Sequence, residues 1–324
     1  MNQVPISRRG VLQAALLTAA IPSMGFAQES RPIEWVVGYA AGGGSDVVAR
    51  SVGDAMSKSL GQAIVINNKP GAATNIAAGY VANSKDFGHV LLTADFATLA
   101  VNPWLFSKLP YDPAKDFRPV GMLARFPMLL VISPKVPAKN VAEFIAWAKA
   151  NGPVTYGSAG VGSPHHLTAE LFRERTGLNL QHAPYRGAAP AVQDLMGGQI
   201  PFAFIDTASV QQYVTAGKLR ALGVASPGRL ATMPDIPTLS EQGVKDFSAY
   251  AWQGLVVPAG TSPDVVSKLS KALQEALNST QVKARFQTLA LEGMQGTPQR
   301  MTTYVDAERE RWGKVIKANN IRLD

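Results

Sequence analysis

The sequence predicts an α/β fold in which two βα domains stand on either side of a ligand cleft. Three observations lead to this prediction. Short apolar runs alternate with segments of helical spacing, the pattern of parallel strands covered by helices. The first apolar run ends in three consecutive glycines, at 42–44, directly before a helical segment. The alternation pauses once, near residues 120–130, and 324 residues are enough for two domains.

The first part of the chain contains three expected strands, at 33–39, 63–67 and 89–93, and two expected helices, at 45–60 and 74–83. The helix at 45–60 follows from apolar residues at helical spacing, among them Val48, Val52 and Met56. A loop rich in Pro and Asp is expected at 102–119. In the apolar stretch 120–133, Arg125 and Pro127 interrupt the pattern, so we expect two strands there.

The alternation resumes after this stretch. We expect helices at 140–150, 164–175, 188–196 and 207–215 and strands at 154–158, 180–185, 200–205, 219–225 and 250–258. Pro263 after Ser262 marks the start of a helix at 263–277. Segments 281–293 and 298–318 are expected to be the last helices. Tyr304, Val305, Trp312 and Ile316 form the expected buried stripe of the last one.

The N-terminus predicts export. Arg8 and Arg9 precede an apolar segment, 11–21, that is too short to anchor the chain in a bilayer. Small residues at Gly25 and Ala27 predict peptidase cleavage after Ala27, so 1–27 is interpreted as a signal peptide. The paired arginines favour twin-arginine export, although an ordinary Sec signal remains an alternative.

Composition excludes some function classes. The net charge of +8 comes from scattered basic residues, which gives little support to a nucleic-acid patch. The absence of cysteine excludes disulfides, a thiolate nucleophile and cysteine metal sites. No nucleotide-binding glycine motif or nucleophile elbow is present, and His166 and Glu170, four residues apart, lack a third metal ligand. We therefore expect no cofactor, no metal and no enzyme. An exported enzyme with His165 or Asp206 as its base remains the alternative.

Three loops of small residues follow expected strands and begin expected helices: loop 1 (42–46), loop 2 (70–75) and loop 3 (158–165). The first turn of a helix presents unpaired N–H groups, and these together with the helix dipole attract an anion. Glycine allows a ligand to approach the backbone closely. The alternative is that the loops need Gly and Ser merely to turn. Ser45 is expected to cap its helix or to donate its hydroxyl. Asp206, at the end of a strand, is expected either to bind ligand or to cap the helix 207–215.

Several blocks of the sequence resemble one family in order along the whole mature chain. They include IEWVVGYAAGGGSDVVAR, YGSAGVGSPHHLTAELF, HAPYRGAAPAVQDLMGGQI and MPDIPTLSE. The family is that of the tripartite tricarboxylate transporter substrate-binding proteins, or Bug receptors. The resemblance implies a monomeric periplasmic binding protein of class II that closes around a small organic acid and passes it to membrane transporter subunits. It implies a ligand site made of Gly43, Gly44, Ser45, Asp46, Ala73, Thr74, Asn75, Ser158, Ala159, Gly160, Ser163, His165 and Asp206.

The expected lobes are 28–126 with 226–324, and 127–225, with hinges at 124–128 and 224–228. The sequence departs from the family pattern near the site. Ala40 and Ala41 replace two prolines, Leu99 replaces a histidine, and Thr207 replaces an asparagine. Losing polar side chains suits a less polar distal group on the ligand. We therefore hypothesise a monocarboxylate or aromatic carboxylate at least as readily as citrate. A receptor that feeds a membrane sensor instead of a transporter is a further alternative.

Overall fold

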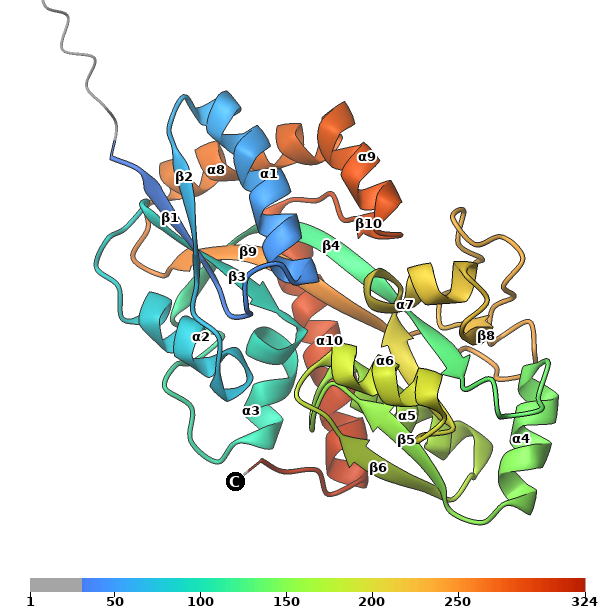
Figure 1. The fold of residues 1–324 in the computed structure, drawn as a ribbon. Helices are drawn as coiled ribbons and strands as arrows, with labels where there is room; N and C mark the ends of the chain where they lie inside the picture. The colour runs from blue at the N-terminus through green and yellow to red at the C-terminus, as the bar shows by residue number, and fades with distance from the viewer. Residues whose placement is uncertain (1–30, 324) are drawn as a thin grey trace, which may run out of the picture. The chain divides into compact units, whose positions relative to one another are not determined.

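One mixed β-sheet runs through residues 31–323, the part of the chain that the structure, a computed structural model, describes (Figure 1). The expected signal peptide, 1–27, lies outside the described residues. The strands are β1 (Ile33–Val37), β2 (Ile64–Asn68), β3 (Val90–Asp95), β4 (Phe117–Ile132), β5 (Val154–Ser158), β6 (Leu180–Pro184), β7 (Phe202–Asp206), β8 (Arg220–Val224), β9 (Tyr250–Pro258) and β10 (Glu292–Gly293). Their order in the sheet is β2-β1-β3-β9-β4-β7-β5-β6, and β8 and β10 also pair with β4.

Helices connect these strands much as the sequence predicts. They are α1 (Gly44–Leu60), α2 (Asn75–Ala82), α3 (Asn102–Leu105), α4 (Val141–Ala150), α5 (Pro164–Thr176), α6 (Ala188–Gly197), α7 (Thr207–Thr215), α8 (Pro263–Asn278), α9 (Thr280–Thr288) and α10 (Pro298–Ala318), with short segments η1 (Ala72–Thr74) and η2 (Phe96–Val101). β1, β2 and β3 pair in parallel, and so do β5, β6 and β7. The predicted α/β fold with two βα groups is therefore confirmed. The strands between the groups, β9 and β4, are antiparallel to their neighbours, unlike the parallel sheets that the alternation predicts.

The expectation of two strands in 120–133 is wrong, because β4 is one strand of 16 residues. Its residues up to Pro127 pair with β9, whereas those from Met128 onward pair with β7 and β8. Proline lacks the N–H that a ladder needs, and here it falls where the strand changes partners. The break in the sequence pattern thus marks a change of partner and not the end of a strand.

A second difference concerns the segment after β3. The sequence predicts a loop at 102–119, but residues 102–105 form α3, which continues the helical turns of η2, and residues 117–119 already belong to β4. Asp95 begins the helical turns, since its side chain accepts a hydrogen bond from the Thr98 N–H. Trp312 of α10 packs edge-on against Phe96, with ring centroids 5.3 Å apart. These turns are therefore stabilised by a cap and by a contact with the distant C-terminal helix.

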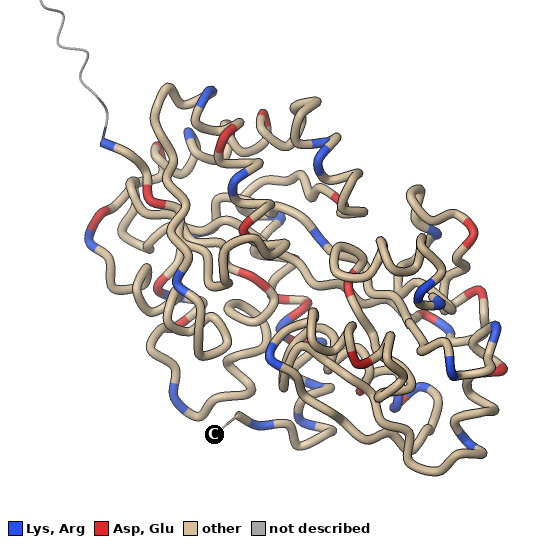
Figure 2. The backbone as a smooth tube through the Cα atoms, in the orientation of Figure 1, with Lys and Arg blue, Asp and Glu red and all other residues tan. Residues whose placement is uncertain are grey.

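The C-terminal helices agree with the prediction except at one end. α9 stops at Thr288, whereas the sequence predicts a helix to 293; Ala290 takes a positive φ of 50° and residues 292–293 pair with β4 instead. In α10 the expected stripe is confirmed, with Val305, Trp312 and Ile316 buried and Tyr304 half-buried. In Figure 2, Lys and Arg residues are interspersed with Asp and Glu over the described chain, as their scattered positions in the sequence predict.

The largest apolar cluster joins both βα groups. It runs from Val36 of β1 through Met128 and Leu130 of β4 to Phe204 of β7. Two smaller clusters are distinct from it, one around α1 and α8 and the other around α6 and α7. β4 therefore connects the two βα groups, with β9 on one side of it and β7 on the other.

Candidate functional site

Loop 1 leaves the start of α1 without a side-chain cap. The helix begins at Gly44, one residue earlier than predicted, and its N-cap residue Gly43 carries no side chain. Ser45 therefore lies inside the first turn and does not cap the helix, which corrects one of the two expectations for it. Its hydroxyl instead accepts a hydrogen bond from the amide nitrogen of Gln253 on β9. The N–H groups of the first turn of α1 are not engaged by a capping side chain.

Asp46 stabilises loop 1 from within. Its carboxylate accepts hydrogen bonds from the Gly42 N–H, Arg50 and Asn68. Burial alone would raise the pKa of Asp46, but these hydrogen bonds hold it below its ordinary value. Gly42 has a positive φ of 83°, which a residue with a side chain rarely adopts. The carboxylate of Asp46 thus fixes the shape of the loop.

The helices divide into two kinds at their N-termini. Six are capped by a side chain that accepts a backbone N–H, namely that of Asn140, Ser163, Asp206, Ser262, Ser279 or Thr297. Within the described chain, three helices of eight or more residues lack such a cap: α1, α2 and α6. Each of the three follows a strand of a parallel group, and no capping side chain occupies the N–H groups of its first turn.

Loop 2 has an unusual backbone. Ala72, Ala73 and Thr74 have φ values of 47°, 51° and 73°, three consecutive left-handed residues that each carry a Cβ. Such a conformation costs about 1–2 kcal/mol per residue, so surrounding contacts must impose it. The Thr74 hydroxyl shares a hydrogen bond of 2.8 Å with that of Thr98, and the Asn75 side chain accepts one from Asn102. Both predicted ligand side chains of loop 2 are therefore engaged within the protein.

A buried network beside loops 1 and 2 was not predicted from the sequence. Asp95, at the end of β3, accepts hydrogen bonds from the Tyr39 hydroxyl and from both the N–H and the hydroxyl of Thr98. Burial raises the pKa of Asp95 in spite of these bonds. The signal was present, because Asp95 ends a parallel strand just as Asp206 does, and the same argument applies to both positions.

Loop 3 satisfies most of its own donors. The Gly160 N–H binds the Ser158 hydroxyl, the Gly162 N–H binds the His166 ring, and the Ser163 N–H binds the Gly160 carbonyl. Ser163 also caps α5 by accepting the His166 N–H. Loop 3 therefore offers fewer free backbone donors than the sequence predicts. The neighbouring start of α6, at Gly187, is uncapped and donates its N–H to the Ala159 carbonyl.

Ser158 and His182 form a close pair, with 2.6 Å between the hydroxyl oxygen and Nε2. The His182 ring stacks on that of His166 at 3.9 Å between centroids. Burial lowers the pKa of His182 to about 4 and that of His166 to about 3. Both rings are neutral near pH 7. A base with so low a pKa is poorly matched to proton abstraction at neutral pH, so neither ring is suited to act as a general base there.

Of the two roles expected for Asp206, the structure shows the cap of α7. It caps α7 through the Ser209 N–H, and its other oxygen lies 3.0 Å from Nε2 of His165. Burial alone would raise the pKa of Asp206, but the hydrogen bonds from His165 and Ser209 lower it. Glu170 binds Tyr156 and Arg173 instead of sharing a metal with His166. Among residues 31–323 no cluster of His, Asp and Glu has a metal-binding arrangement.

Close contacts connect the three loops. A Cβ at Gly38, beside loop 1, would lie 2.9 Å from Cβ of Thr74 in loop 2. Asn102 of α3 donates to the Ala73 carbonyl of loop 2 at 2.8 Å. One turn later, Leu105 touches loop 3, because a Cβ at Gly162 would lie 2.2 Å from its Cδ1. Loops 1, 2 and 3 are therefore joined through α3.

The connection closes through β4. His165 of loop 3 contacts Asp206, which is the register partner of Met128 on β4. Two residues earlier on this strand, Phe126 lies against loop 1, with its Cε1 3.4 Å from a Cβ built at Gly44. We call this closed series of contacts the ring; it consists of Gly38, Gly44, Thr74, Asn102, Leu105, Phe126, Met128, Gly162, His165 and Asp206. Four of the predicted ligand-binding residues belong to the ring: Gly44, Thr74, His165 and Asp206.

The ring contains buried polar atoms without hydrogen-bond partners. The described residues contain five such side-chain atoms. Two of them, Asn102 Oδ1 and His165 Nδ1, belong to the ring, and a third, Gln253 Oε1, belongs to the residue that contacts Ser45. Buried polar groups ordinarily have a hydrogen-bond partner, and each exception requires an explanation. An ordered water or a ligand group would satisfy these atoms.

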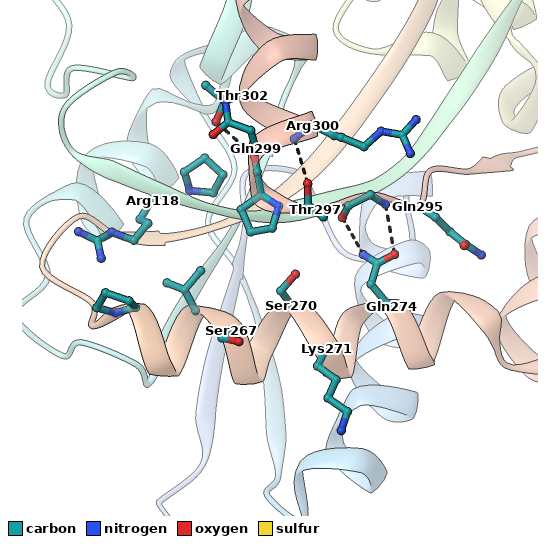
Figure 3. A pocket seen from close by; sticks show the side chains of 15 residues that line it. Arg118, Ser267, Ser270, Lys271, Gln274, Gln295, Thr297, Gln299, Arg300 and Thr302 are labelled. Atoms are coloured by element: carbon teal, nitrogen blue, oxygen red, sulfur yellow. Dashed lines mark hydrogen bonds between the residues drawn. The ribbon is translucent and has the colours of Figure 1, made fainter.

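A separate groove of about 820 Å³ lies between α8 and the start of α10 (Figure 3). Gln274 crosses it and exchanges hydrogen bonds with the backbone of Gly296. None of the predicted ligand-binding residues lines this groove. It is therefore distinct from the site that the three loops form.

Comparison with known proteins places the chain among transport receptors. A model described as the tripartite tricarboxylate transporter family receptor matches residues 48–321. The chain is 34% identical to protein BugT of Bordetella pertussis, over 91% of each chain. Among solved structures it resembles R. palustris Rpa4515 with adipate, at 32% identity and a TM-score of 0.84, over 91% of this chain and 99% of that one. It also resembles MatC from Rhodopseudomonas palustris with bound malate, at 32% identity and a TM-score of 0.79, over 89% and 99%.

Proposed function

The chain belongs to the tripartite tricarboxylate transporter receptor family, and from this premise we propose that it binds a small organic carboxylate in the periplasm and delivers it to membrane transporter subunits. It is a transport receptor, as the sequence predicts, and not an enzyme. No helix within residues 31–323 combines the length and the apolar composition that crossing a membrane requires.

One observation carries the proposal: α1 and α2 both begin without a side-chain cap, and Thr74, the N-cap residue of α2, lies against Gly38 in the segment that leads from β1 to α1. A carboxylate placed there accepts N–H groups of the first turns and lies at the positive ends of two helix dipoles. The Ser45 hydroxyl adds a side-chain donor from loop 1. The uncapped start of α6 supplies further N–H groups from the second βα group.

The two βα groups close on the ligand in this proposal. The lobes are 28–126 with 226–324, and 127–225, and the chain crosses between them at 124–128 and 224–228. β4 changes partners between Pro127 and Met128, inside the first crossing, which is where a rotation disturbs fewest ladder bonds. Closure excludes water and strengthens each charge-assisted hydrogen bond to the carboxylate.

The ligand of this chain is proposed to differ from citrate at its distal end. Two similar structures contain the dicarboxylates adipate and malate. Leu99 is buried in the core where the family pattern has a histidine, and the Thr207 hydroxyl donates to the Ala290 carbonyl at 2.9 Å. Neither side chain is available to a second carboxylate. A monocarboxylate or an aromatic carboxylate is therefore proposed at least as readily as citrate.

Thermal unfolding of residues 28–324 tests this proposal. The protein is unfolded and refolded to remove carried-over ligand and is then heated with a panel of organic acids, each paired with its neutral amide. Ligand at one hundred times its dissociation constant adds about 2.7 kcal/mol of stability, enough to raise Tm by several degrees. We expect a shift with at least one acid and none with its amide. Equal shifts with both would refute carboxylate capture, and tighter binding of citrate than of every monocarboxylate would refute the ligand hypothesis.

A further inference from the structure

Gln253 reaches the place where the proposed function puts the ligand carboxylate. It lies on β9, with Asp95 of β3 and Ala124 of β4 as its register partners. Its residue is only 5% exposed, and its amide nitrogen donates to the Ser45 hydroxyl in the first turn of α1. A buried amide therefore lies beside the uncapped helix end.

Half of this amide has no partner. Oε1 of Gln253 accepts no hydrogen bond from any residue in the described part of the chain. A buried acceptor left in this state costs free energy comparable to its full desolvation. The two amide atoms share one carbon, so Oε1 is held close to the same first turn as Ser45. A ligand group that donates a hydrogen bond next to its carboxylate would satisfy this oxygen.

Two common ligand groups donate in this way, a hydroxyl and an ammonium. The positive end of the α1 dipole disfavours an ammonium. Asp95, the register partner of Gln253 on β3, is already engaged by three hydrogen bonds from Tyr39 and Thr98. A hydroxyl carries no charge, and because it both donates and accepts it suits either orientation of the amide.

We propose that Gln253 selects for a hydroxyl group on the carbon beside the captured carboxylate, which makes 2-hydroxy acids the preferred ligand class. The inference rests on the proposed function, and it names the feature of the ligand that the site distinguishes. Combined with the apolar distal end proposed above, it favours 2-hydroxy monocarboxylates over 2-hydroxy dicarboxylates.

Matched pairs of ligands test the inference by isothermal titration calorimetry of refolded 28–324. The pairs are lactate and propionate, mandelate and phenylacetate, and malate and succinate, with each enantiomer of the hydroxy acid measured and alanine added as the ammonium counterpart of lactate. We expect the native protein to bind the hydroxylated member of at least one pair about tenfold more tightly, the effect of one hydrogen bond. In Gln253→Met this preference should fall to about twofold or less.

Gln274→Met is the matched control. Its amide bonds the backbone of Gly296 in the separate groove, so this variant should keep the native preference. If Gln253→Met does not fold, Gln253→Asn withdraws the amide while keeping its polarity, and the same loss of preference is expected. An unchanged ratio in the folded variant, or no hydroxyl preference in any pair, would overturn the inference while the proposed function stands. Tighter binding of alanine than of lactate overturns it too. Binding of no acid at all overturns the proposed function and the inference together.

Discussion

Acidification from pH 7 to pH 5 should destabilise this protein through two buried histidines. Burial, with His182 and Arg173 nearby, lowers the pKa of His166 to about 3, and burial lowers that of His182 to about 4. An unfolded histidine has a pKa of about 6.5, so below that pH the unfolded chain binds protons that the folded chain does not. The stability that depends on these two histidines is therefore at its full value above about pH 6.5, and it falls as the pH decreases toward the folded pKa values.

The magnitude at pH 5 depends mainly on the unfolded pKa. The pH lies about 1.5 units below it, and each unit corresponds to about 1.36 kcal/mol. Through His166 the free energy of unfolding should therefore fall by about 2 kcal/mol. His182 adds less than this because it is only half-buried and solvent screens it. The carboxyl group of Asp206, whose pKa is lowered, loses its contribution only near and below pH 4, outside this interval.

Urea unfolding at pH 7 and pH 5 measures this difference in the free energy of unfolding. We compare the native protein with the double variant His166→Gln/His182→Gln and with His89→Gln, which replaces a more exposed histidine 3.6 Å from Asp86. The double variant should lose most of the pH dependence, and the control should keep it. Asp95, whose pKa is raised, makes the same contribution to the pH dependence of stability in all three proteins. An undiminished pH dependence in the double variant would refute the reasoning.

Three further predictions concern the loops. Gly162→Ala should cost more stability than Gly152→Ala. Both glycines have a positive φ, which costs alanine about 1 kcal/mol, but only an alanine at 162 would also collide with Leu105 of α3, which adds about 1–3 kcal/mol. Equal costs in urea unfolding would remove that contact from the ring. Ser163→Ala and Ser262→Ala should each lose about 1 kcal/mol of stability as lost helix caps, but only the first should also weaken ligand binding in calorimetry; equal affinities would exclude loop 3 from the site. Gly44→Val should weaken binding by about 1–3 kcal/mol while the circular dichroism spectrum stays native; native affinity would exclude loop 1.

Most of the fold could be predicted because its elements have local causes. The helix at 207–215 and the strands at 154–158 and 250–258 agree with the structure residue for residue, since each is bounded by turn or capping residues that act on their neighbours. The errors share another cause. β4 continues through Pro127 because the strand pairs with β9 before this residue and with β7 after it. α9 ends earlier than predicted because residues 292–293 pair with β4. Contacts between distant segments override local preference at both positions.

The site divides in the same way. The sequence by itself determined the three small-residue loops, the strand-ending Asp206 and the family, because these depend on residue type and order. Only the tertiary structure decided which polar groups are used within the protein and which remain free. Ser45 lies 208 positions from Gln253, and Asp206 lies 41 from His165. No local pattern encodes such pairs, since a hydrogen bond forms only where folding brings its donor and acceptor together.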